Sequence, residues 1–90
     1  MAKYVLIHEV GKDLTMELGE PFAQAIKVNH TLDAYWVGSF YLREEGKLYC
    51  EWDAKDTDSI RQVIAKVAPD FKDDPIYEME LNINSEDYRS

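Results

Sequence analysis

One histidine and two glutamates are the residues of this chain whose types could do chemistry together. His8 lies near the end of an apolar segment, and Glu51 and Glu78 lie in two later segments. An imidazole with two carboxylates suits Zn, Ni, Mn or Fe as a ligand set, and the same groups could act as a general base with supporting acids. A histidine at a strand end can also simply pair with an acid, and acids on an outer strand discourage edge pairing. His8, Glu51 and Glu78 are therefore the candidate metal site, beside a purely structural interpretation.

The elements that must position these residues follow from the apolar pattern. Strands are predicted where β-branched and aromatic residues are dense, at 3–10, 34–42, 48–53 and 75–83. A helix is predicted over 14–30, and its regular part is expected to begin near Glu20 because Pro21 suits a first turn. A second helix is predicted at 60–67, where apolar residues recur at helical spacing, with cap oxygens at 56–59. Gly46 predicts a tight turn with positive φ.

The order strand, helix, strand, strand, helix, strand predicts one α+β domain of ferredoxin-like βαββαβ type over residues 1–83, with a frayed tail at 84–90. Right-handed crossovers give an antiparallel sheet in the order 4-1-3-2. Both helices then cover one face and leave the other open, as in dimeric α/β barrels.

Alternation along the strands predicts which side chains occupy the open face. The expected set is Tyr4, Leu6, His8, Val37, Ser39, Tyr41, Tyr49, Glu51 and Glu78. A face this rich in aromatic residues is typical of an interface or a pocket wall, so we predict a homodimer whose sheets pack face to face. Cys50, Trp36 and Trp52 are expected on the helix side, so a Cys50–His8 nucleophile is not expected.

The three candidate ligands come from strands that the predicted order makes neighbours. With the 3–10 and 48–53 strands taken as parallel, and 75–83 antiparallel to the first, His8, Glu51 and Glu78 could converge at one edge of the open face. The second histidine, His30, falls at a helix C-terminus, where a partly positive ring suits the helix dipole.

Charge and missing motifs exclude several functions. The net charge is −8 and the pI about 4.6, and such an acidic chain does not suit nucleic acid or anionic membranes. One cysteine allows no internal disulfide, and no signal peptide is evident, so we expect a cytoplasmic protein. C-x-x-C, P-loop and H-E-x-x-H patterns are absent.

Three stretches carry a resemblance to a known family. They are the run 8–15 that begins His-Glu-Val-Gly-Lys-Asp, the run Trp-Val-Gly-Ser-Phe at 36–40, and the second half from Gly46 to Glu78. Together they resemble the small ferredoxin-like domain-of-unknown-function family that includes a bacterial nickel-binding, nickel-responsive protein. The resemblance implies a homodimer with metal near the sheet, and it carries a ligand only at His8. Members often bear a histidine in helix two, where this chain has none between 65 and 69.

Three functions remain open from the sequence. The first is a small cytoplasmic homodimeric binding protein for a divalent transition metal such as nickel. The second is a cofactor-free enzyme of monooxygenase or isomerase type, with a tyrosine-lined pocket and His8 as base. The third is a structural dimerisation domain. A deep apolar cavity between sheet and helices would favour the enzyme, carboxylates around His8 the metal, and a flat, filled interface the scaffold.

Overall fold

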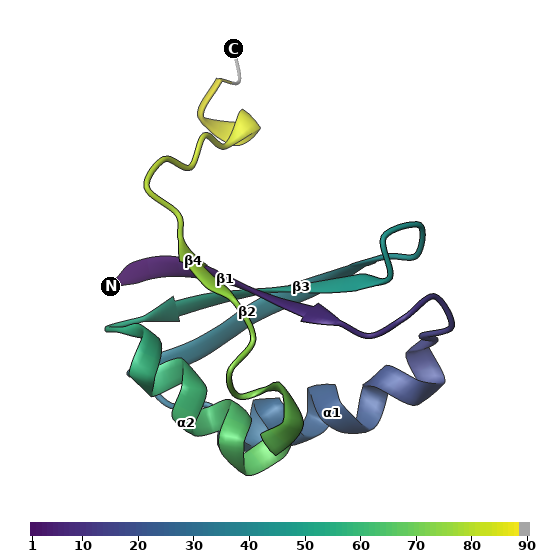
Figure 1. Cartoon of the computed structure of the whole chain (residues 1–90). Coiled ribbons are helices and arrows are strands. Elements are labelled where there is room, and N and C mark those ends of the chain that lie inside the picture. The colour runs from purple at the N-terminus through teal and green to yellow at the C-terminus, as the bar shows by residue number, and fades with distance from the viewer. Residues whose placement is uncertain (89–90) are drawn as a thin grey trace.

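The structure, a computed structural model, describes residues 1–88. The elements follow one another as β1 (Ala2–Glu9), α1 (Met16–Asn29), β2 (Ala34–Leu42), β3 (Lys47–Ala54), α2 (Thr57–Val67), β4 (Ile76–Glu78), with short 3₁₀-helices at Pro69–Phe71 and Ser85–Tyr88. The four strands form one sheet in the order β2-β3-β1-β4, and every neighbouring pair is antiparallel. Both helices lie on the same side of it (Figure 1). The predicted ferredoxin-like fold and strand order are therefore confirmed.

The prediction that the first and third strands run parallel is wrong. β2 and β3 form a hairpin closed by Gly46 at φ +67, so these two strands run antiparallel. β1 reaches β2 through the α1 crossover and runs parallel to it, which makes β1 antiparallel to β3. Gly46 is also tucked against Gly11, where an added Cβ would approach the Gly11 carbonyl carbon to 3.2 Å.

β1 faces the helices with the side opposite to the one predicted. Leu6 pairs with Cys50 and Tyr4 with Trp52, and paired residues of an antiparallel ladder share a face. Tyr4, Leu6 and His8 are consequently buried, whereas Val5 and Ile7 lie on the open face. The prediction failed because β1 is apolar on both sides in the run Tyr-Val-Leu-Ile, so alternation gives no signal there.

A β-bulge at Val37 changes the predicted faces of β2. Trp36 pairs with Trp52, but the next ladder pair joins Gly38 to Glu51, so Val37 is an extra residue. Beyond the bulge, Ser39 and Tyr41 face the helices rather than the open side. Phe40 instead lies on the open face and stacks on Tyr49, with ring centroids 5.0 Å apart.

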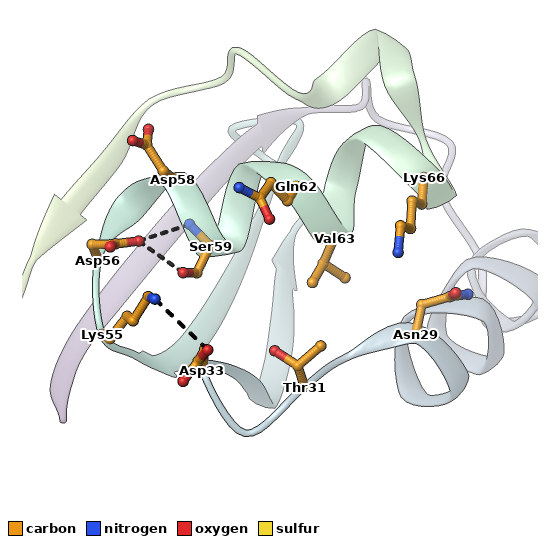
Figure 2. A pocket seen from close by; sticks show the side chains of 10 residues that line it. All are labelled: Asn29, Thr31, Asp33, Lys55, Asp56, Asp58, Ser59, Gln62, Val63 and Lys66. Carbon is orange, nitrogen blue, oxygen red and sulfur yellow. Dashed lines mark hydrogen bonds and ion pairs between the residues drawn. The ribbon is translucent and has the colours of Figure 1, made fainter.

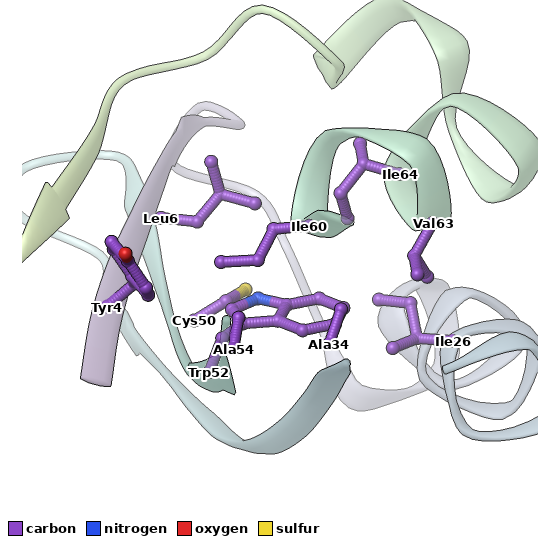
Figure 3. Packing of buried hydrophobic residues seen from close by; sticks show 10 residues of the cluster. All are labelled: Tyr4, Leu6, Ile26, Ala34, Cys50, Trp52, Ala54, Ile60, Val63 and Ile64. Atoms are coloured by element: carbon purple, nitrogen blue, oxygen red, sulfur yellow. The ribbon is translucent and has the colours of Figure 1, made fainter. Parts of the chain in front are cut away.

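The core lies between the sheet and α2. Trp52, Leu6 and Ile60 are its largest fully buried side chains (Figure 3). The predicted helix at 60–67 is confirmed within α2, which Asp56 caps by accepting a hydrogen bond from the Ser59 backbone N–H (2.8 Å). The indole N–H of Trp52 is buried without a hydrogen-bond partner in residues 1–88, which costs about 1–3 kcal/mol.

Helix α1 begins earlier than predicted, and it packs less closely on the sheet than α2 does. Thr15 caps it by accepting a hydrogen bond from the Leu18 backbone N–H (3.2 Å), and the helix runs from Met16 through Pro21 instead of beginning near Glu20. Only Ile26 of this helix is buried. Leu18 and Phe22 remain 59% and 49% exposed, which means that the N-terminal half of α1 stands away from the sheet.

Strand β4 is much shorter than the predicted 75–83. It pairs with β1 only at Ile76–Glu78, followed by one hydrogen bond from the Met79 N–H to the Lys3 carbonyl (2.8 Å). The pairing of Tyr77 with Val5 puts the apolar set of this segment on the open side. Glu78 and Glu80 would then face the helices, so longer pairing would bury charge instead of apolar surface.

In residues 1–88 no helix is long and apolar enough to cross a membrane.

Candidate functional site

A cavity of about 450 Å³ lies between α1 and the sheet. It exists because the N-terminal half of α1 does not close onto the strands. Its walls are mainly apolar and include Leu14, Leu18, Phe22, Trp36, Leu48 and Phe71. A second cavity of about 480 Å³ shares Leu14, Ala23, Trp36 and Leu48 with the first and continues towards Tyr41 and Arg43. The two cavities together form one apolar trough. Of the tyrosines predicted for a pocket wall, Tyr41 lines it, whereas Tyr4 and Tyr49 do not.

His8 is the buried polar side chain of this trough, with only 5% of its surface exposed. Its Nδ1 lies 2.7 Å from Oδ2 of Asp74, and its ring contacts Phe71 at 5.0 Å between centroids. His8 lines the first cavity and Arg43 the second, so they lie towards opposite ends of the trough.

Asp74 is held in place by its own loop and by α2. The guanidinium of Arg61 donates to the carbonyl oxygens of Lys72 and Asp74, at 2.7 and 2.9 Å. The backbone N–H of Ile7 donates to the carbonyl of Pro75 (3.0 Å), which ties the loop to β1 directly beside His8. The carboxylate that contacts His8 is therefore positioned by two independent sets of hydrogen bonds.

The contact with Asp74 decides which nitrogen of His8 is available. An ionised carboxylate only accepts hydrogen bonds, so Nδ1 carries the proton and donates it. In the neutral ring the lone pair is then on Nε2, which has no hydrogen-bond partner in the described residues. A carboxylate–imidazole pair of this kind orients a histidine for metal ligation or for general-base action.

The three predicted metal ligands do not come together. Glu51 lies on the open face of the sheet, the side opposite to His8. Glu78 is on the same side as His8 but pairs with Tyr4, four residues before His8 in β1. Within residues 1–88 no group of three or more His, Cys, Asp or Glu residues could hold a metal ion. The expected convergence failed because it rested on the wrong direction and face of β1.

Comparison with known proteins places this architecture in a family. The family described as "Nickel responsive protein SCO4226-like" matches residues 4–79. This chain belongs to that family. The crystal structure of SCO4226 from Streptomyces coelicolor A3(2) superposes with a TM-score of 0.78 and 18% sequence identity, over 91% of this chain and 100% of that chain. At this identity the likeness shows the fold alone. No curated protein matched the chain.

Sequence reasoning missed Asp74, the residue whose carboxylate contacts His8. A signal was present, because Asp74 precedes Pro75 and lies two residues before β4. Ile76 at the start of β4 pairs with Leu6, so a residue two positions before this antiparallel strand must lie near His8, two positions after Leu6.

Cys50 shares the helix-facing side with His8, contrary to the prediction that they lie on opposite faces. Burial raises the pKa of its thiol to about 11, although a hydrogen bond with Ser39 acts in the opposite direction. Cys50 is therefore a neutral thiol at physiological pH and does not serve as a nucleophile. Ser39 also accepts a hydrogen bond from the Trp36 indole N–H (2.9 Å), which fixes that ring in the trough wall.

His30 has a structural role that differs from the predicted one. Its Nδ1 accepts a hydrogen bond from the Trp36 backbone N–H (3.3 Å), and its ring stacks on Tyr35. Burial, and then the charge of Lys27, lower its pKa, so the ring is kept neutral instead of supplying positive charge to the end of α1.

A polar hollow of about 380 Å³ lies beside the start of α2 (Figure 2). Its charges are of both signs and largely paired already. Lys55 lies 3.8 Å from Asp33, and Asp56 is used in capping α2. This hollow therefore favours no ligand of either charge.

We expect Asp74→Ala to remove the preference of the neutral His8 ring for the tautomer with the proton on Nδ1. Two-bond ¹H–¹⁵N NMR of the neutral wild-type ring should show the proton on Nδ1, and the variant should show a mixture. Asp73→Ala is the matched control, because Asp73 contacts exposed Lys72 instead of His8. A wild-type ring protonated on Nε2, or a variant identical to wild type, would contradict the assignment.

The raised pKa of Cys50 predicts a loss of stability at alkaline pH. A folded-state pKa above the ordinary value of 9.0 means that stability is complete below pH 9 and falls as pH rises towards about 11. The loss should reach about 3 kcal/mol. Urea denaturation of wild type and Cys50→Ala between pH 7 and pH 11 tests this, since the variant should lack that share of the slope. Parallel curves would show that the thiol ionises equally in both states.

Proposed function

We propose that this chain is a binding protein for a small, mainly apolar organic molecule, held between α1 and the sheet. The observation that carries this proposal is the cavity of about 450 Å³ with apolar walls and His8 as its buried polar group. Ligand pockets of this size, lined by hydrophobic residues with few polar groups, are the common form of small-molecule sites.

The chemistry of His8 narrows the ligand class. With Nδ1 donating to Asp74, the neutral ring offers the Nε2 lone pair, so the ligand should carry one hydrogen-bond donor such as a hydroxyl or amine. The rings of Phe22, Trp36 and Phe71 around the cavity favour an aromatic body. The same arrangement would let His8 act as a base on a bound hydroxyl, as the cofactor-free enzyme interpretation requires.

Nickel is the second candidate, supported by the name of the family and by the carboxylate on the far side of His8. Metal-ligating histidines usually donate the N–H of their other ring nitrogen to a carboxylate, a carbonyl or water. Since the described residues supply no further cluster, a metal at Nε2 would complete its shell with water or with groups from a second chain.

We also propose that the protein is a homodimer through its open sheet face, in a reducing compartment such as the cytoplasm. The stacked pair Phe40–Tyr49 and the exposed Tyr77 support the interface, because apolar rings on an open sheet face gain from being covered. The lone buried thiol of Cys50 fits the compartment.

Filling the cavity should abolish ligand binding. We expect the neutral fluorescent amine N-phenyl-1-naphthylamine to bind wild type and to bind Ala23→Phe at least about tenfold more weakly, because the new ring occupies the trough. Gln24→Phe adds the same ring at the next, exposed position of α1 and should bind like wild type. Fluorescence titration measures all three, and equal affinities would place the probe elsewhere.

The nickel candidate predicts a different pattern. Native mass spectrometry with added Ni²⁺ should show stoichiometric metal on wild type and on His30→Ala but none on His8→Ala. The two histidine variants are matched controls for each other, since no other histidine exists in the chain. Metal retained by His8→Ala would move the site away from the trough, and a metal-free wild type would remove the nickel candidate.

A further inference from the structure

The segment that follows β4 leaves the body of the molecule. It rises from the edge of the sheet on the side away from both helices (Figure 1). Leu81, Asn82 and Ile83 make no hydrogen bond to any described residue, and Leu81 and Ile83 are 80% and 66% exposed. Apolar side chains that stay exposed to water are unfavourable, so burying them against a partner would be favourable.

The sequence of this segment has the pattern of a strand with one apolar side. Tyr77, Met79, Leu81 and Ile83 alternate with Glu78, Glu80 and Asn82. The pairing of Tyr77 with Val5 sets the direction of the apolar side at the start of the segment, and it is that of the open sheet face. We name residues 79–84 the arm.

The open face is the second uncovered apolar surface of the same chain. Val37 and Phe40, each about half exposed, lie in β2, and Phe40 stacks on Tyr49 of β3. The arm and this face lie on the same side of the sheet, yet the arm extends away from its own face. Two complementary surfaces of one chain that do not meet within it can meet between two copies.

We propose that the arm of each chain packs on the open sheet face of a second copy, in a reciprocal exchange. This rests on the proposed homodimer and specifies what covers its interface. A two-fold arrangement uses the same pair of surfaces twice, as a closed symmetric dimer requires.

The dimensions allow this arrangement. An extended chain advances about 3.3 Å per residue, so residues 79–84 reach about 20 Å. Four strands about 4.8 Å apart make a sheet about 15–20 Å wide. The arm can therefore cross a partner's sheet and bring Leu81 and Ile83 over its aromatic residues.

The test places a negative charge on the apolar side of the arm in one variant of the full-length chain and on its polar side in another. Leu81→Asp should raise the dimer dissociation constant about a hundredfold or more in sedimentation equilibrium, because each dimer loses two buried leucines. Asn82→Asp adds the same charge at the neighbouring, polar position and should leave the constant within about threefold. Circular dichroism melting of both variants under monomeric conditions should match wild type, since Leu81 and Asn82 are exposed within the single chain.

A crosslink identifies the surface that the arm covers. p-Benzoylphenylalanine at position 81, in a mixture of light chains and ¹⁵N-labelled chains, should join light to heavy peptides from 35–42 or 47–53. Crosslinks within one chain only would show that the arm folds back on its own sheet and would overturn the exchange.

The outcomes separate the arm from the dimer. If wild type and Leu81→Asp dimerise equally, the exchange is wrong and the face-to-face dimer stands. If wild type is a monomer at micromolar concentration, both are wrong. If the two aspartate variants weaken the dimer equally, charge alone is responsible and the apolar contact is refuted.

Discussion

The antiparallel register between β1 and β3 is the constraint on which the rest of the structure depends. It sets Leu6 opposite Cys50 and Tyr4 opposite Trp52, which assembles the core that α2 covers. The same register puts His8 on the helix side, opposite Leu48. A shift by one residue would exchange the two faces of β1, exposing Leu6 and moving the histidine to the open side. The same strand register therefore determines both the packing of the core and the position of the candidate site.

The site arises where helix packing is incomplete. α2 closes tightly on the sheet through Ile60, Val63 and Ile64, whereas α1 is anchored by Ile26 and stands off at its other end. The apolar side chains of α1 that might have filled a core instead line a trough. The loop before β4 then brings Asp74 to the one buried imidazole. The loose packing of α1 on the sheet therefore leaves the cavity in which His8 is accessible as a functional group.

The overall fold was predictable because its signals are local. The spacing of Ile60, Val63, Ile64 and Val67 defines α2, and Gly46 defines the hairpin turn. The faces of β1 and β2 were not, because β1 is apolar on both sides and simple alternation does not account for the extra residue at the Val37 bulge, for which Gly38 is the local signal. The candidate site failed with them, since ligand convergence depends on facing. Asp74 was not predicted because it lies in a loop. Its contact with His8, 66 residues away in the sequence, depends on the path that the chain takes between α2 and β4.

The two indoles of this chain lie in surroundings that differ in a useful way. Trp52 is fully enclosed by the core, while Trp36 forms part of the trough wall with its N–H bonded to Ser39. Indole emission responds to the polarity and mobility of its neighbourhood, so one ring reports on unfolding and the other on what enters the trough. The protein carries its own pair of optical probes, and replacing either indole by phenylalanine would separate the two signals without any attached dye.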